Sequence, residues 1–382
     1  MVSRAQRTLF GEWWWTVDRV LLGALFAIVL LGIILLLAAS PPLATRLGLD
    51  PFHFVHRQGF YLVPAICVLI ATSLLSSRQV RRVALIVFAV SVVLVALTPF
   101  VGAEIKGARR WLSILGFSLQ PSEFLKPAFI VMTAWMFAES KRNPEMPSTL
   151  LAVASLGVVV FLLVRQPDFG QTVLISLVWC ALFFISGLRW VWVAGLGGAA
   201  LSSVLISYHS IHHVRSRINR FLDPGSGDTF QIDTAIESFM RGGWLGRGPG
   251  EGTVKRILPD GHADFIFAVA AEEFGIVLCL ILVLLFAFVV LRALLHAARE
   301  EDPFMRLAIA GIALLFGLQS SIAMAVNLHL VPAKGMTLPF VSYGGSSLIS
   351  LAFGMGMLLA LTRRHPRLRD IEEDFVHEGA RA

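Results

Sequence analysis

The chain has 382 residues, of which 56% are hydrophobic and only 15% are charged, and its formal net charge is +7. Soluble globular proteins carry about 25% charged residues, so this composition, with a mean hydropathy of +0.76, excludes a soluble domain and a soluble nucleic-acid binder. The excess of positive charge suits anionic partners such as lipid headgroups or phosphates.

Long apolar runs recur along the chain and predict membrane-spanning helices, each of which needs about 20 apolar residues. Ten runs qualify, at 20–39, 60–76, 83–100, 122–139, 148–164, 171–187, 190–207, 265–295, 304–327 and 339–361. Only helices and closed barrels satisfy every backbone polar group in lipid. The sequence therefore predicts an all-α polytopic membrane protein, with residues 1–382 forming a single transmembrane domain.

Basic residues cluster beside one set of helix ends, and this asymmetry predicts how the chain crosses the membrane. They precede the first span, follow the last and recur in alternate loops: Arg4, Arg7, Arg19, Arg78, Arg81, Arg82, Lys141, Arg142, Arg292, Arg299, Arg306, Arg363 and Arg364. The positive-inside rule then places residues 1–19 and 363–382 in the cytoplasm. Residues 208–264 become a large extracytoplasmic loop between the seventh and eighth spans.

Several cations lie on the opposite, outer face, where this rule disfavours them. A long loop crosses the membrane regardless of its charge, which accounts for the basic residues of 208–264. The short outer loops lack that explanation, and they contain Lys106, Arg109, Arg110 and Lys334. We therefore expect an anion to bind at the outer face.

Residues 101–126 combine a cationic turn at Lys106 with an aromatic residue, Trp111, whose flat ring suits a sugar or a lipid headgroup. Residues 112–119 are typical of a short hairpin, and Pro121 marks the start of a helix. Glu123 and Lys126 are three residues apart and share a helix face. Two interpretations remain open: a structural ion pair, or a lysine that binds a substrate phosphate.

The outer loops 165–171 and 208–256 hold weaker signals. Asp168 is predicted to cap the following helix or to pair with a loop arginine. Residues 208–223, which include Arg217, are typical of an amphipathic helix at the interface. The glycine-rich stretch 242–252 has no Walker pattern, although glycine lets backbone N–H groups approach a phosphate closely.

The stretch from Trp244 to Gly275 runs from this loop into an apolar helix, and Asp264 stands at the mouth of that helix, just after His262. Acidic residues at membrane depth are costly and usually functional. For Glu272 and Glu273 we favour pairing with an Arg or Lys from a neighbouring helix. For Asp264 we favour chemistry, and the alternative is a salt bridge to Lys255 or Arg256 that holds the loop. In the last loop, Lys334-Gly335 forms a cationic turn, and Leu338-Pro339-Phe340 is predicted to begin the last helix.

Six separated motifs together resemble the SEDS glycosyltransferases (the RodA/FtsW family). They are KGARRWL at 106–112, QPSEFLK at 120–126, RQPDFGQT at 165–172, RINRFLDP at 217–224, LPDGHADFIFAVAAEEFG at 258–275 and GMTLPFVSYGGSS at 335–347. The resemblance covers nearly the whole chain and is closer to the division-type branch, FtsW, than to the elongation-type branch, RodA. One departure is Ala263, where many members have Thr.

This resemblance implies a ten-helix fold in the bacterial inner membrane, at the division septum, with a large periplasmic loop. It implies a polymerase that joins lipid II, the undecaprenyl-pyrophosphate-linked disaccharide peptide, into β-1,4 glycan strands. The family's essential aspartate falls on Asp264, and its other functional residues fall on Lys106, Arg110, Trp111, Glu123 and Lys126. The implied partners are a class B penicillin-binding protein similar to FtsI, other division proteins and membrane lipids.

The chemistry of such a transfer suggests a role for each candidate. Asp264 is the expected general base, with His262 beside it. The pyrophosphate leaving group needs neutralised charge, which we assign to Lys106, Arg110, Lys126 and Lys334, with Arg217 and Lys255 as weaker candidates. A divalent cation, Mg²⁺ or Mn²⁺, is the one cofactor we consider, as a bridge on the pyrophosphate; no organic cofactor is expected.

Two alternatives are an elongation-type polymerase and a lipid II flippase. Transport favours ionisable residues at the bilayer midplane and broken helices in repeat-related positions. Here the charges gather at the outer face and no internal repeat is visible. The sequence therefore favours an enzyme over a transporter.

Overall fold

The computed structural model describes residues 9–363, except for 106–107, 115–116, 144, 333–334 and the stretch 188–228, in which it describes single positions only. Its helices are α1 (Leu9–Thr16), α2 (Arg19–Arg46), α3 (His53–Ser73), α4 (Ser77–Val101), α5 (Pro121–Arg142), α6 (Ser148–Arg165), α7 (Phe169–Ile185), α10 (Phe230–Gly242), α11 (Ile266–Arg299), α12 (Pro303–Asn327) and α13 (Gly345–Leu361). The predicted all-α fold is confirmed.

Nine of the ten predicted spans coincide with helices α2–α7 and α11–α13. Six of these are long and apolar enough to cross a membrane, namely α2, α3, α4, α6, α11 and α12, while α7 and α13 are shorter apolar helices. The remaining predicted span, 190–207, lies outside the described elements. The total of ten spans therefore stays a prediction.

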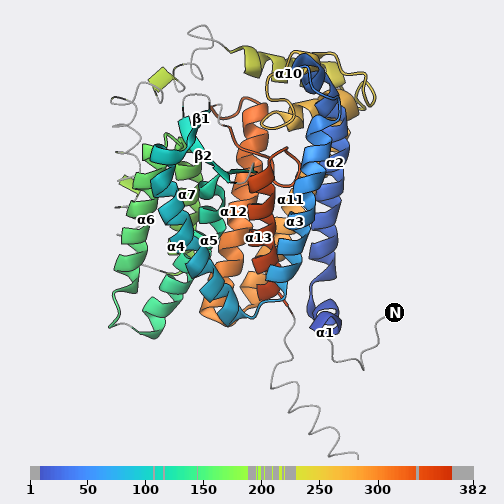
Figure 1. Cartoon of the computed structure of the whole chain (residues 1–382). Helices are drawn as coiled ribbons and strands as arrows, with labels where there is room; N and C mark the ends of the chain where they lie inside the picture. The colour runs from blue at the N-terminus through green and yellow to red at the C-terminus, as the bar shows by residue number, and fades with distance from the viewer. Residues whose placement is uncertain are drawn as a thin grey trace, which may run out of the picture.

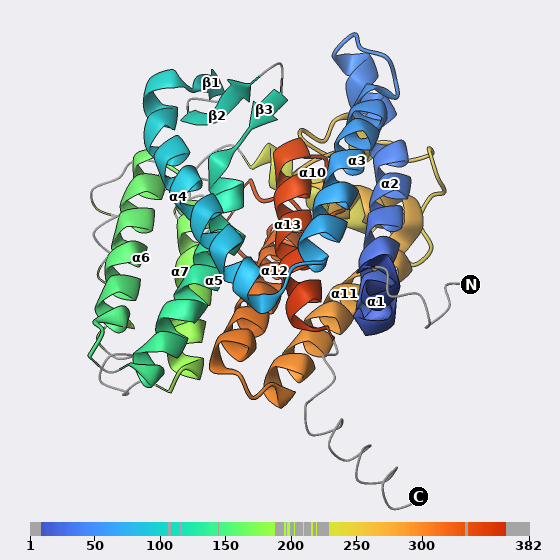
Figure 2. The ribbon, with the colours of Figure 1, turned by 60° about the horizontal axis from the view of Figure 1, so that its bottom comes forward.

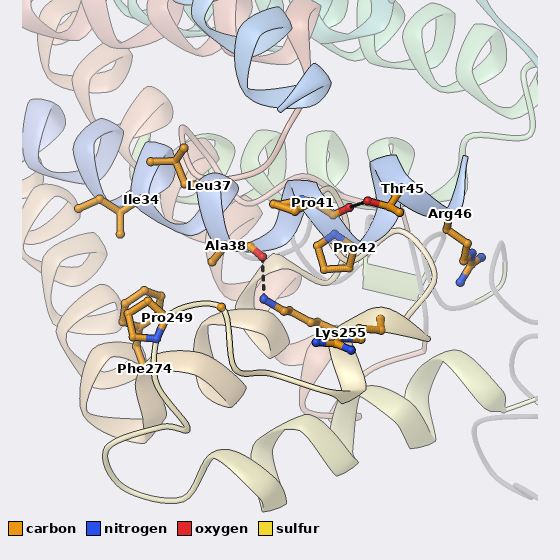
Figure 3. A pocket seen from close by; sticks show the side chains of 12 residues that line it. Ile34, Leu37, Ala38, Pro41, Pro42, Thr45, Arg46, Pro249, Lys255 and Phe274 are labelled. Carbon is orange, nitrogen blue, oxygen red and sulfur yellow. Dashed lines mark hydrogen bonds between the residues drawn. The ribbon is translucent and has the colours of Figure 1, made fainter. Parts of the chain in front are cut away.

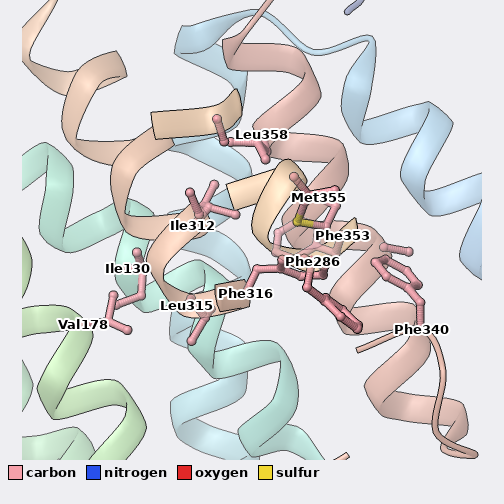
Figure 4. Close-up of a cluster of buried hydrophobic side chains, with 14 of the residues drawn as sticks. Ile130, Val178, Phe286, Ile312, Leu315, Phe316, Phe340, Phe353, Met355 and Leu358 are labelled. Atoms are coloured by element: carbon pink, nitrogen blue, oxygen red, sulfur yellow. The ribbon is translucent and has the colours of Figure 1, made fainter. Parts of the chain in front are cut away.

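Helix α12 lies inside the bundle, between α11, α5, α7 and α13 (Figures 1 and 2). Its aromatic residue Phe316 packs against Phe286 of α11, with ring centroids 5.5 Å apart, and against Phe340, at 6.3 Å. Figure 4 shows this cluster extending to Ile130 of α5 and Met355 of α13. Apolar faces that meet inside the bundle thus form one continuous core.

A small antiparallel sheet and α10 lie at one end of the bundle, and α1 lies at the other (Figure 1). Strands β1 (Ala103–Ile105), β2 (Ala108–Ile114) and β3 (Phe117–Leu119) form the sheet in the order β1-β2-β3. The pairing of Leu112 with Leu119 confirms the predicted hairpin. We call this end, which also carries residues 242–264, the outer end.

The two ends of the described chain meet at the opposite, inner end. Arg363, just after α13, donates hydrogen bonds to the Thr16 hydroxyl at 3.0 Å and to the Leu74 carbonyl at 3.2 Å. Asp18 caps α2 and pairs with Arg292, near the end of α11, at 2.7 Å. Both described chain ends are therefore tied to the same end of the bundle.

The predicted start of the last helix, at Leu338, is wrong. Residues 338–344 form a buried turn in which the Ser342 hydroxyl accepts a hydrogen bond from the Leu338 N–H at 2.8 Å, and Phe340 has a φ of 61°. Helix α13 begins only at Gly345, where a Cβ atom would lie 2.5 Å from the ring of Tyr61. The turn is apolar and therefore reads as helix in the sequence, but its backbone is irregular.

Candidate active site

Asp264 lies on a turn that precedes α11. The N–H groups of Ala263 and Phe265 donate to the Asp260 carbonyl at 3.0 and 3.2 Å, and Asp260 adopts a φ of 53°, a conformation that Asp tolerates better than most residues. The helix begins at Ile266. Asp264 is therefore presented by a folded turn at the mouth of the helix, and not by the helix face itself.

Three consecutive backbone carbonyls of this turn, those of residues 262–264, each accept a hydrogen bond from a distant part of the chain. The donors are the Tyr343 N–H to His262 at 3.0 Å, the Ser342 hydroxyl to Ala263 at 2.6 Å and the Asn327 amide to Asp264 at 2.9 Å. We call these three donors the carbonyl clamp. Because they come from the end of α12 and from the turn before α13, the clamp fixes the Asp264 backbone against two other elements.

Asn327 binds the backbone on both sides of the start of α11. Its side chain is 1% exposed, and its Oδ1 atom accepts the N–H of Ala268 at 3.1 Å while its Nδ2 atom donates to Asp264. One amide thus joins the backbone before α11 to the first turn of α11. Sequence reasoning missed this residue; its only local signal is an amide at the last position of an apolar span.

The carboxylate of Asp264 lies beside Gly335. A Cβ atom at position 335 would lie 3.1 Å from the Oδ2 atom of Asp264, and both residues are partly or fully exposed. The structure therefore brings the predicted base together with Gly335, one residue of the predicted cationic turn. Lys334 itself lies outside the described residues.

His262 stands among aromatic rings. Its ring lies 4.5 Å from that of Phe54 on α3 and 5.3 Å from that of Tyr343, centroid to centroid. These contacts orient the histidine beside the turn. Burial raises the pKa of the Tyr343 hydroxyl, so this neighbour stays neutral at physiological pH.

Glu123 and Lys126 form the ion pair that their spacing allows. The two charged groups are 3.0 Å apart, and Lys126, which is 2% exposed, also donates to Gln319 of α12 at 3.0 Å. Gln171 of α7 donates to Glu123 at 2.9 Å, and Gln319 donates to the Thr337 carbonyl at 3.1 Å. The structural interpretation therefore has direct support, and a phosphate contact of Lys126 stays a prediction.

Arg110 and Trp111 lie on β2 at the outer end. Arg110 donates to the carbonyls of Gln166 and Pro167 at 3.0 and 2.6 Å and lies 4.0 Å from the Asp168 carboxylate. Asp168 also caps α7 by accepting the Gln171 N–H, as predicted. Burial raises the pKa of Asp168, and the Arg110 charge opposes that shift. Arg110 thus holds the 165–168 turn, while Trp111 stays partly exposed.

Glu272 and Glu273 are both 0% exposed and are enclosed by residues 247–255. Glu272 accepts the N–H groups of Thr253, Val254 and Lys255 at 2.6 to 2.8 Å. Glu273 accepts the Gly250 N–H at 3.1 Å and pairs with the Lys255 ammonium. Glu273 does pair with a basic residue, but that residue comes from the preceding loop and not from a neighbouring helix, and the oxygens of Glu272 are bound by backbone N–H groups instead. Lys255 is thus engaged by Glu273, and not by Asp264.

The glycine-rich stretch also accepts a hydrogen bond from backbone left without a helical partner at a kink in α11. Gly275 has a φ of 78°, and the Ile276 N–H, freed by this kink, donates to the Gly243 carbonyl at 2.9 Å. A Cβ atom on Gly246 would lie 2.1 Å from the Glu273 carbonyl oxygen. The glycines therefore let the loop pack closely against the kinked helix. The loop N–H groups that the sequence suggested as phosphate ligands bind the carboxylates of Glu272 and Glu273 instead.

Lys106 and Arg217, two further candidates, lie outside the described residues, so their predicted roles stay predictions. Among the described residues, no group of three or more His, Cys, Asp or Glu side chains lies close enough together to hold a metal ion. A cation bridging a substrate pyrophosphate would take ligands from the substrate itself, so this observation does not test the Mg²⁺ or Mn²⁺ prediction.

Comparison with known proteins places this site in a family. A family model described as "Cell cycle protein", FtsW/RodA/SpoVE, matches residues 18–366. A probable peptidoglycan glycosyltransferase FtsW of Caulobacter vibrioides is 47% identical over 365 residues, covering 95% of this chain and 94% of that protein. A probable FtsW of Geobacter sulfurreducens is 35% identical, covering 91% of this chain and 95% of that protein.

Solved structures agree with this assignment. A chain from a peptidoglycan synthase complex, described as coordinating polymerization and crosslinking, aligns with a TM-score of 0.76 and 28% identity, covering 91% of this chain and 97% of that one. The rod shape determining protein RodA of Thermus thermophilus aligns with a TM-score of 0.67 and 28% identity, with the same coverage.

Proposed function

Because this chain belongs to the FtsW/RodA/SpoVE family and is a peptidoglycan glycosyltransferase of the FtsW type, we propose that it polymerises lipid II with Asp264 as the general base. The observation that carries the proposal is the carbonyl clamp. It fixes the backbone of Asp264 at the outer end, where the residue lies beside Gly335 and is partly exposed. A base needs a fixed position that substrate can reach.

The transfer is a single displacement. The 4-hydroxyl oxygen of the acceptor sugar attacks the anomeric carbon of the donor, and its proton passes to Asp264. The bond between that carbon and the undecaprenyl pyrophosphate oxygen breaks, and the pyrophosphate leaves with the electron pair. Attack opposite the leaving group inverts an α-linked donor into a β-1,4 product.

We assign the neutralisation of the leaving group first to Lys334 and Lys106. Lys334 adjoins Gly335 in the sequence, and Gly335 lies beside the Asp264 carboxylate. Arg110, Lys126 and Lys255 already bind carbonyls or carboxylates of the protein, so they are weaker candidates. A divalent cation on the pyrophosphate would supply further charge neutralisation.

The test is glycan-strand synthesis from purified lipid II by the wild type and by Asp264→Asn, each co-purified with a class B penicillin-binding protein. Removing a general base lowers a rate by about 10²- to 10⁴-fold, and we expect a loss of that size with unchanged thermal stability. Asp260→Asn is the matched control, since it makes the same chemical change in the same turn and Asn tolerates the positive φ of this position.

Full polymerisation by Asp264→Asn would overturn the assignment of the base. Equal loss in Asp260→Asn and Asp264→Asn would show that the turn, and not the carboxylate, is what matters. If the partnered wild type made no polymer but moved lipid II across vesicle membranes, the flippase interpretation would replace the enzyme.

The proposal extends to partner and location. The relative described as a peptidoglycan synthase complex supports a penicillin-binding partner, and the FtsW-type relatives support a place in the inner membrane at the septum. The hydrogen bond from Arg363 to Thr16 at the inner end supports the placement of both termini on the same, cytoplasmic side of the membrane. Labelling of single cysteines placed before α1 and after α13, in intact cells and in lysed cells, tests that orientation.

A further inference from the structure

A cavity lies at the outer end between α2 and the 249–256 loop, away from the carbonyl clamp (Figure 3). Its volume is about 820 Å³, which lies in the range of small-molecule sites. None of the candidate catalytic residues lines it except Lys255, whose charge is paired with Glu273. The mechanism above leaves this cavity unused.

Helix α2 contains two prolines, Pro41 and Pro42, where it lines the cavity. Pro42 has no N–H group, so the Ala38 carbonyl, four residues earlier, loses its helical partner. The Lys255 ammonium takes that place and donates to Ala38 at 3.0 Å, as the dashed line in Figure 3 shows. The bond holds the loop to α2 at one point, and the space opens beside it.

One part of the lining is apolar and open to lipid. Ile34 and Leu37 of α2 are 38% and 43% exposed, and α2 is a membrane-spanning helix. Phe274 and Pro249 line the opposite wall. Since an exposed apolar side chain on a spanning helix faces the hydrocarbon of the bilayer, an alkyl chain can enter from the membrane without crossing water.

The other part of the lining is cationic. Arg46 comes from the last turn of α2 and Arg256 from the loop, and both are exposed and line the cavity. Among the described residues, neither guanidinium has a hydrogen-bond or ion-pair partner. Ile34 and Arg46 are 12 positions apart on one helix, a rise of about 18 Å. The lining therefore changes from apolar to cationic towards the outer membrane surface.

We infer that this cavity binds one anionic phospholipid, with its phosphate between Arg46 and Arg256 and an acyl chain along Ile34 and Leu37. Guanidinium groups bind phosphate oxygens through paired, charge-assisted hydrogen bonds. The apolar wall continues into the bilayer, which a soluble phosphate would not use. The inference rests on the chain's lying in a membrane and not on the proposed reaction.

The test is native mass spectrometry of the delipidated full-length protein with three added probes: phosphatidylglycerol, phosphatidylcholine with the same acyl chains, and inorganic phosphate. We expect the wild type to retain one phosphatidylglycerol in preference to phosphatidylcholine. The double variant Arg46→Ala/Arg256→Ala is expected to bind it at least tenfold more weakly. Leu37→Trp, which fills the apolar wall, is expected to weaken binding with both arginines intact.

The matched control is Arg165→Ala/Arg241→Ala, which removes two exposed arginines from the same end of the bundle, neither of which lines the cavity. It is expected to bind phosphatidylglycerol as the wild type does. Equal binding by the wild type and Arg46→Ala/Arg256→Ala, or equal weakening by the control, would overturn the inference. Inorganic phosphate that binds as tightly as the lipid would overturn the acyl-chain part and leave an anion site.

Discussion

Asp264 and the Glu272–Glu273 pair lie within ten residues of one another, yet the protein treats their carboxylates in opposite ways. The two glutamates are fully buried, and loop N–H groups and Lys255 bind their oxygens. At Asp264 the clamp binds the backbone carbonyls of residues 262–264, and the residue itself is partly exposed beside Gly335. In one region the side-chain charges stabilise the fold. In the other, backbone hydrogen bonds fix the position of the residue that we propose as the base.

The largest expected effect on stability lies in the buried region. Glu273→Ala leaves the Lys255 ammonium buried without its carboxylate, which costs about 3–5 kcal/mol in comparable buried pairs. We expect a large drop in the melting temperature of the detergent-solubilised protein. The double variant Lys255→Met/Glu273→Leu removes both charges and is expected to recover much of that loss; a double variant as unstable as Glu273→Ala would contradict the account.

An intermediate effect is expected at the clamp. Asn327→Ala leaves the Asp264 carbonyl and the Ala268 N–H without their partner, at a cost of about 1–3 kcal/mol. Since Asn327 positions the base without touching substrate, we expect the polymerisation rate kcat to fall more than KM changes. The measurement is steady-state polymerisation at a temperature where the variant is fully folded. Unchanged kcat in the folded variant would assign Asn327 to stability alone.

The smallest effect on stability is expected at the inner end. There the Asp18 carboxylate both caps α2 and pairs with Arg292 and His296. Burial opposes its ionisation, but hydrogen bonds from His296 and Arg292 outweigh burial and hold the pKa of Asp18 well below its usual range. Because the pKa is lower in the folded state, the ionised carboxylate stabilises the fold at pH values above the unfolded pKa of about 3.9. That stabilisation is lost as the pH falls below about 3.9 towards the folded pKa.

Asp18→Asn keeps the helix cap, because Asn caps nearly as well as Asp, and loses only the partly exposed ion pair, about 0.2–1 kcal/mol. We expect a small loss of thermal stability at pH 7 that shrinks as the pH falls below about 4 towards the folded pKa. Thermal unfolding measured across that range checks it. A constant difference at every pH would show that the Asp18 charge contributes nothing.

Local patterns in the sequence were sufficient for much of the fold and part of the site. The apolar runs predicted nine helices, Pro121 marked the start of α5, and the hairpin formed as expected. Asp264 was found because an acid at the mouth of an apolar helix is unusual. The turn before α13 was misread because its residues are as apolar as a helix, and Asn327 was missed because a single amide has no distinctive pattern.

By itself, the sequence determined the all-α class, the membrane location and the candidate base, because hydropathy, caps and turns depend on neighbours along the chain. The tertiary structure alone decided which charges meet. Lys255 pairs with Glu273, and the Gly243 carbonyl binds the Ile276 N–H at the kink in α11. Asn327 binds the backbone carbonyl of Asp264, 63 positions away in the sequence. Hydrogen bonds between distant segments require atoms within about 3 Å, and only the packing of the helices sets those distances.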